Sequence, residues 1–124
     1  MNQFIIVRTL AIAFALVASS SHHARAEEPV LTGLDAVYAM IGNTVIFNHR
    51  GALVAIFFAP DHSTTAKMGK EVESSKWRMS ADKLCFGPDD KCASVEVRGK
   101  HVKMTAENHE TFEGELLSGN PLKL

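Results

Sequence analysis

The sequence has few of the residues that usually mark a chemical activity. Its 124 residues include two cysteines, one tryptophan and one tyrosine, and its acidic and basic side chains nearly balance, at a formal net charge of −1. This balance argues against the strongly basic surface that is typical of nucleic-acid binding. The short motifs of nucleotide-binding loops, serine hydrolases and zinc peptidases are also missing. We therefore expect no enzymatic activity, no cofactor, no bound metal and no nucleic-acid partner.

Long apolar runs are missing too, except near the N-terminus. Residues 1–26 combine Arg8, an apolar core from Thr9 to Ala18, and the triplet Ala24-Arg25-Ala26. This layout is typical of a secretory signal peptide, and its core is shorter than the roughly 20 residues of a membrane span. We predict cleavage after residue 26, a periplasmic or secreted location, and no membrane insertion of the remaining chain.

Residues 27–124 contain no repeat and no linker, which predicts a single β-rich domain. The stretch TGLDAVYAMIGN, residues 32–43, is typical of a helix, and Thr32 with Asp35 resembles a capping box at its start. The helix has apolar residues at helical spacing, which we expect to form its buried face: Leu34, Val37, Tyr38 and Ile41.

After the helix, alternating polar and apolar residues predict short strands and tight turns. Several registers put apolar residues together on one face: Met79 with Leu84, Trp77 with Phe86, Val97 with Val102, Val95 with Met104, and Ala106 with Phe112. We expect a mainly β fold with one N-terminal helix (α+β), in which an antiparallel meander of about seven strands closes into a small barrel or curved sheet. A two-sheet sandwich is the alternative.

The most apolar segment is LVAIFFAP, residues 53–60, which has apolar side chains on both faces of one strand. We expect the outward set to pack beneath the helix; if it does not, it forms an exposed surface for a partner. We take four residues of this region and of the tryptophan strand as a ligand or partner surface: Phe58, Asp61, His62 and Trp77.

The two cysteines stand in the stretch LCFGPDDKCASVEV, residues 84–97. If Leu84 pairs with Ala93, residues 87–90 form a turn, and Cys85 and Cys92 become cross-strand neighbours on the face away from the core. Such neighbours can form a disulfide. A redox pair and a metal site are the alternatives, but the C-x-x-C spacing and the nearby ligands that they require are missing.

The segments GNTV, FAPD and LCF, together with Trp77 and a second cysteine before an alternating strand, form a recognisable pattern. In this pattern the chain resembles a group of small secreted proteins from alphaproteobacteria that share a domain of unknown function. The resemblance extends from about Leu31 to Leu122. It implies export and paired cysteines, and it implies no activity.

The hypothesis that follows is an exported, non-enzymatic domain that binds a protein or a small ligand. One alternative is a lysozyme-inhibitor-like protein, which needs a protruding loop; APDHST at residues 59–64 and GKEVESS at residues 69–75 are the candidates. The other is a small lipocalin-like carrier of an apolar ligand. A carrier needs an internal cavity, and we expect its lining to be Trp77, Phe86, Met104 and Phe112.

Overall fold

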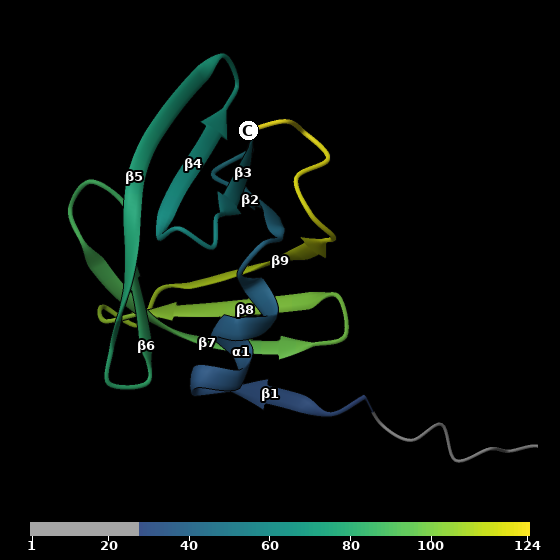
Figure 1. The fold of residues 1–124 in the computed structure, drawn as a ribbon, viewed down its shortest axis with the longest axis vertical. Coiled ribbons are helices and arrows are strands. Elements are labelled where there is room, and N and C mark those ends of the chain that lie inside the picture. The colour runs from purple at the N-terminus through teal and green to yellow at the C-terminus, as the bar shows by residue number, and fades with distance from the viewer. Residues whose placement is uncertain (1–27) are drawn as a thin grey trace, which may run out of the picture.

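The computed structural model describes residues 28–124, so the predicted signal peptide lies outside the described residues. Strands β2 to β9 form an antiparallel meander, and β9 returns to pair with β2, which closes the sheet into a barrel (Figure 1). The predicted class, a mainly β barrel with one N-terminal helix, is confirmed, with one more barrel strand than we predicted. The elements are β1 Val30–Thr32, α1 Gly33–Met40, β2 Thr44–His49, β3 Ala52–Phe58, β4 Ser63–Met68, β5 Glu71–Ser80, β6 Lys83–Phe86, β7 Lys91–Arg98, β8 His101–Ala106 and β9 Thr111–Leu117.

Tight turns with positive φ angles connect several of these strands. Arg50 and Gly51 between β2 and β3 have φ of 51° and 81°, as a type I′ turn requires. In the β7–β8 turn Gly99 has a φ of 57° and Lys100 does not have a positive φ, as expected for the type II′ turn that its sequence favours. Turns of these types match the twist of the strands, so they fix the register of each hairpin.

The predicted registers in the middle of the meander are confirmed. Met79 lies opposite Leu84, Leu84 opposite Ala93, and Val95 opposite Met104. Because cross-strand partners share a face of the sheet, these residues all point toward the barrel interior.

The predicted β8–β9 register is wrong. Phe112 lies opposite Met104 and not opposite Ala106. The turn is longer than expected, because the Ala106 N–H donates to the Glu110 carbonyl (2.8 Å) and the Glu110 N–H donates to Asn108 Oδ1 (3.0 Å). The register slips by two residues, and a slip of two keeps every side chain on its predicted face.

Helix α1 begins and ends close to the predicted positions, and of its predicted buried face Val37 and Ile41 pack with the core whereas Leu34 and Tyr38 do not. Thr32 is the N-cap residue, yet its side chain makes no capping hydrogen bond, so the predicted capping box is wrong. Leu34 and Tyr38 are 49% and 66% exposed, which corrects the predicted buried face. The residues that α1 buries are Ala36, Val37 and Met40. The small side chain of Ala36 allows the helix to lie close to the sheet.

The two faces of β3 also separate differently from our expectation. Val54, Ile56 and Phe58 point inward and pack with the core, and Leu53 on the outer face is 61% exposed. The outer set does not pack beneath the helix, because α1 lies chiefly against β7, β1 and β6. This prediction is therefore wrong, and Leu53 stays open to solvent.

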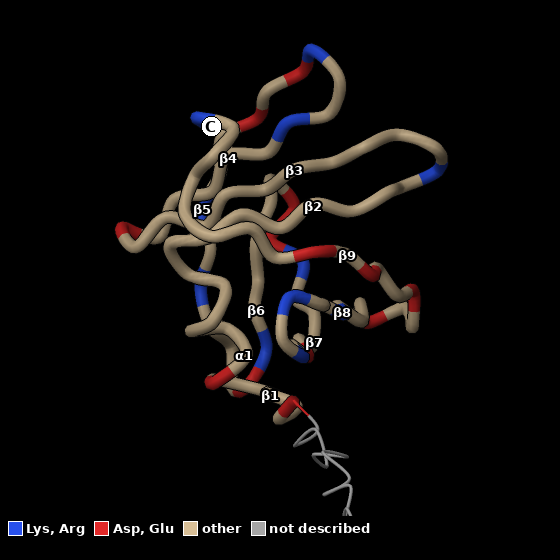
Figure 2. The backbone as a smooth tube through the Cα atoms, turned by 90° about the vertical axis from the view of Figure 1, so that its right-hand side faces the viewer, with Lys and Arg blue, Asp and Glu red and all other residues tan. Residues whose placement is uncertain are grey.

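The polar segment at residues 69–75, which we predicted as a connection, is mostly strand. Only Gly69 and Lys70 form the turn, and β5 starts at Glu71. The side chains of Glu71 to Ser74 are exposed on both faces, so they lack the alternation that reveals a half-buried strand. The β4–β5 hairpin projects from the barrel with charged residues near its tip (Figure 2).

The core is one cluster of apolar side chains from α1 and from the inner faces of most of the strands. Its largest fully buried members are Phe58, Met40, Leu84, Val37, Val45, Val97 and Val102. These residues lie on α1, near the start of β2, β6 and β8, and near the end of β3 and β7. The core therefore lies toward the end of the barrel where α1 runs into β2.

Candidate functional site

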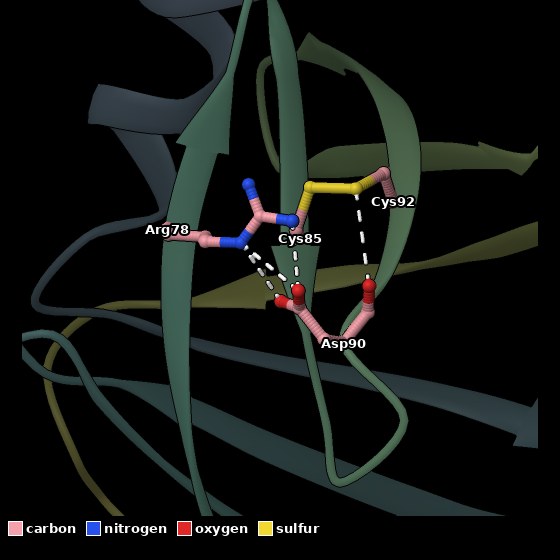
Figure 3. Close-up of polar contacts among 4 residues, drawn as sticks. All are labelled: Arg78, Cys85, Asp90 and Cys92. Atoms are coloured by element: carbon pink, nitrogen blue, oxygen red, sulfur yellow. Dashed lines mark hydrogen bonds and ion pairs between the residues drawn. A yellow bond between two sulfur atoms is a disulfide. The ribbon is translucent and has the colours of Figure 1, made fainter.

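The predicted disulfide between Cys85 and Cys92 is confirmed. The two residues are direct cross-strand partners on β6 and β7, and their Cα atoms are 3.9 Å apart. They lie on the outer face of the barrel, opposite in direction to Leu84 and Ala93. The disulfide joins the two strands just before and after the β6–β7 turn, so it limits how far this turn can open (Figure 3).

An ion pair holds the same turn from the side of β5. The Arg78 Nε donates to both carboxylate oxygens of Asp90 at 3.0 Å, and Nη2 donates to Oδ2 at 2.7 Å (Figure 3). The hydrogen bonds from Arg78 hold the pKa of Asp90 below its usual range, and the bonded carboxylate raises the pKa of Arg78. Both side chains are about half exposed, so the pair positions the turn more than it stabilises the fold.

The four residues that we took as a ligand or partner surface lie at the end of the barrel near the core. Phe58 is fully buried in the core, and Trp77 is only 7% exposed. The Trp77 ring stacks on His62, with ring centroids 4.0 Å apart, and its Nε1 donates to the Ala59 carbonyl (2.7 Å). Only Asp61 and His62 are therefore open to solvent.

Asp61 and His62 close the β3–β4 turn. Asp61 Oδ1 accepts hydrogen bonds from the backbone N–H (2.9 Å) and the hydroxyl (2.6 Å) of Ser63, and these bonds lower the pKa of Asp61. His62 has a left-handed backbone (φ 73°), and its carbonyl accepts the Trp77 N–H. These contacts explain both residues as parts of a tight turn, and neither residue lines the cavity at the other end of the barrel.

A cavity lies at the other end of the barrel. Its volume is about 530 Å³, and residues of the β2–β3, β6–β7 and β8–β9 turns surround it. In a meander, alternate turns fall at the same end of the barrel, which explains why these three turns meet. We call this cavity the mouth; the side chains that line its wall are Phe47, Phe86, Ala93, Met104, Ala106 and Phe112.

Aromatic rings form one side of the mouth. The Phe47 and Phe112 rings are tilted against each other with centroids 5.6 Å apart, and the His49 ring lies 5.4 Å from Phe112. On another side, Phe86 packs edge-on against the buried Phe58 at 5.4 Å. Phe47, Phe86 and Phe112 are only partly buried, so their rings face both the core and the open volume.

The rim of the mouth carries charges of both signs. Arg50 and Lys91 are exposed basic residues, and three exposed acidic residues complete the rim: Asp89, Glu107 and Glu110. None of the acidic groups forms an ion pair with a basic residue in the described chain. The mouth therefore combines an apolar, aromatic interior with a polar edge, the combination that is typical of sites for small amphipathic ligands.

Three of the four residues that we expected to line a cavity do so, namely Phe86, Met104 and Phe112. Trp77 does not, because it lies beside His62. Phe47 and His49 were missed. The alternation of TVIFNH places Val45 and Phe47 on one face, and this signal could have identified Phe47, whereas the position of His49 over Phe112 depends on the β2–β9 pairing.

Searches against protein-family models, curated proteins and solved structures found no match to this chain. Within residues 28–124, no helix is long and apolar enough to cross a membrane. Over the same residues, no group of three or more His, Cys, Asp or Glu side chains is arranged to hold a metal ion. The geometry of the barrel and its mouth is therefore the basis on which a function can be argued.

Proposed function

We propose that this protein is an exported, non-enzymatic binding protein that holds one small amphipathic ligand in the mouth of its barrel, in the manner of a lipocalin-like carrier. The observation that carries the proposal is the cavity of about 530 Å³, whose wall is made of phenylalanine, methionine and alanine side chains. Cavities between about 300 and 1,000 Å³ are typical of sites for a single small molecule. A fully packed barrel would offer no such volume.

The lining limits the chemistry of the ligand. Phe47, Phe112 and Phe86 offer ring faces and edges, so a flat or ring-containing apolar group fits this wall best. The rim carries two basic and three acidic residues, so it favours a polar or zwitterionic head group over a strongly charged one. The ligand would bury its apolar part and keep its polar end at the turns.

Export is the second part of the proposal. The disulfide supports it, because such bonds form and persist in oxidising compartments and are rare in the cytosol. The signal-peptide pattern of residues 1–26 supports the same conclusion. We favour a carrier over a lysozyme-inhibitor-like protein because the cavity is the feature that a carrier needs.

A fluorescent probe can test the binding role. N-phenyl-1-naphthylamine is an uncharged, ring-containing fluorophore that brightens in apolar surroundings. We expect a saturable signal with one site per chain. The variant Ala106→Trp places a large ring in the mouth and should weaken binding by about tenfold or more, because it takes the volume that the probe needs.

The matched control is Ser94→Trp, which adds the same ring to the exposed outer face of β7. This variant should bind the probe as the unmodified protein does. Equal binding by a folded Ala106→Trp variant would show that the probe binds elsewhere, and the proposal would then be wrong.

A further inference from the structure

Strand β5 is longer than the strands on either side of it. Its last four residues, Trp77 to Ser80, pair with β6, and its first six, Glu71 to Lys76, pair only with β4. This first part rises with β4 beyond the β6–β7 turn (Figure 1). Along residues 71–76, the edge of β5 that would face β6 therefore has no neighbouring strand in the described chain.

The pairing with β4 identifies the backbone groups that lie at this open edge. The Trp77 N–H donates to the His62 carbonyl on the β4 side (2.8 Å). The register between the two strands is unchanged from this pair to the pair of Met68 with Glu71. Because successive residues of a strand direct their backbone groups to opposite sides, Val72, Ser74 and Lys76 direct N–H and C=O to the open edge. Within residues 28–124 no strand pairs with Val72 and Ser74 on this side, whereas Lys76 borders Gly87, the residue that follows β6.

The open edge has the features of a strand that can accept a further strand. Residues 71–74 and Lys76 are exposed, and the segment contains no proline and no bulge. Strand β1, which stands at one end of the sheet order, has three residues and follows Pro29, so it offers a much shorter edge.

The charges along the edge favour a basic segment of a partner over a second copy of this chain. Glu71 and Glu73 share a face with Met68 and Ala66, their partners on β4. A second copy that paired antiparallel along the same edge would bring four carboxylates onto one face, which is unfavourable. A strand with Lys or Arg at alternate positions would instead place opposite charges beside Glu71 and Glu73.

We propose that residues 71–76 of β5 form a strand-addition site for an extended segment of a partner polypeptide that carries Lys or Arg at every second position. The backbone groups of Val72 and Ser74 supply the hydrogen bonds, and the two glutamates select the basic residues. On the other face, Val72 and Ser74 accept apolar or hydroxyl side chains. This site is separate from the mouth, whose lining includes no residue of β5.

The probe is a blocked seven-residue peptide in which Thr and Lys alternate, compared with the same peptide carrying Glu for Lys. Binding is measured by NMR titration together with hydrogen exchange of the backbone amides. We expect the Lys peptide to bind, with affinity that falls as salt rises, and to slow the exchange of the Val72 and Ser74 amides by about tenfold or more. The Glu peptide should not bind.

A proline pair provides the matched variants. Ser74→Pro removes an N–H that faces the open edge. It should leave the melting temperature nearly unchanged and lower the affinity for the Lys peptide by about tenfold or more. Ser75→Pro removes an N–H that faces β4, so it should lower the melting temperature. Ala106→Trp, which fills the mouth, should bind the peptide normally, and this separates the present proposal from the proposed ligand site.

If Ser74→Pro does not fold, the exposed double variant Glu71→Lys/Glu73→Lys keeps the proposal testable, because it should bind the Glu peptide and lose the Lys peptide. The proposal is overturned if the Lys peptide fails to bind, if its affinity survives these variants, or if it protects amides outside residues 71–76. It is also overturned if the protein alone dimerises with the same amides protected, because a second copy is then the occupant.

Discussion

At the end of the barrel where α1 runs into β2, side chains fill the interior, whereas at the opposite end the same strands enclose an open volume. Met40, Val45 and Phe58 at the first end are fully buried. At the second end, Phe47 and Phe112 are only partly buried and line a cavity of about 530 Å³. The alternation of inward and outward side chains is the same at both ends, so alternation alone does not determine whether a barrel is filled.

The difference comes from the segments outside the meander. At the filled end, α1 adds Val37 and Met40 to the core. Asn43 joins this end to the C-terminal segment, because its Nδ2 donates to the Ala39 carbonyl (2.8 Å) and its Oδ1 accepts the Gly119 N–H (2.9 Å). The open end is bordered by turns, whose charged side chains, such as Arg50 and Lys91, are exposed at the rim and do not fill the interior.

The largest expected effect belongs to the filled end. Phe58→Ala should lower the free energy of unfolding by about 3–5 kcal/mol, because it removes a fully buried ring and leaves a cavity in a packed core. Urea unfolding of the purified protein measures this change. A loss of less than about 1 kcal/mol would show that this end is not tightly packed.

The disulfide should have the next largest effect. Replacing both Cys85 and Cys92 with Ala should cost about 2.5 kcal/mol, the value expected for opening a loop of about eight residues in the unfolded chain. Because the disulfide also limits the β6–β7 turn at the rim, the double variant should bind the naphthylamine probe more weakly. Unfolding in urea and the probe titration give the two values, and unchanged values for both would contradict this role.

Phe112→Ala at the open end should cost only about 1–2 kcal/mol, less than the matched change at Phe58, because the ring of Phe112 is partly exposed. It should nevertheless weaken binding of the naphthylamine probe, since it removes one wall of the mouth. A larger loss of stability for Phe112→Ala than for Phe58→Ala would reverse the assignment of the filled and open ends.

The smallest expected effect concerns Arg78 and Asp90. The folded protein holds the pKa of Asp90 below its ordinary value of about 3.9, so the ionised carboxylate contributes stability above that pH. This contribution is lost as the pH falls through the lowered pKa. The melting temperature of the unmodified protein should exceed that of Asp90→Asn at pH 7 by a small margin that disappears in acid. A margin that grows in acid would contradict the assigned direction of the pKa.

Much of the barrel could be predicted from the sequence, because alternation and turn residues are local signals. The Cys85–Cys92 pair and the pairing of Val95 with Met104 follow from short turns such as Gly99-Lys100. The β8–β9 register could not be predicted, because the side chain of Asn108 stabilises a longer turn than the sequence pattern suggests.

Other features depend on contacts between distant parts of the chain. Strand β1 has three residues and is a strand only because it pairs with β7. Leu34 and Tyr38 have the spacing of a buried helix face, yet the face that contains Ala36 is buried because it can approach the sheet closely. The mouth could be predicted only in part, because the pattern identifies inward side chains such as Phe112 and Met104 but not the volume that they leave.

The two ends can be compared in a single NMR titration that uses methionine methyl groups. Met40 lies in the filled core, Met104 lines the mouth, and Met68 is 43% exposed on the β4–β5 hairpin. With ¹³C-methyl methionine labelling and the naphthylamine probe, we expect the Met104 signal to shift and saturate while the Met40 and Met68 signals stay in place. A shift of Met40, or a Met104 signal that does not move while the probe binds, would contradict the assignment of the mouth as the ligand site.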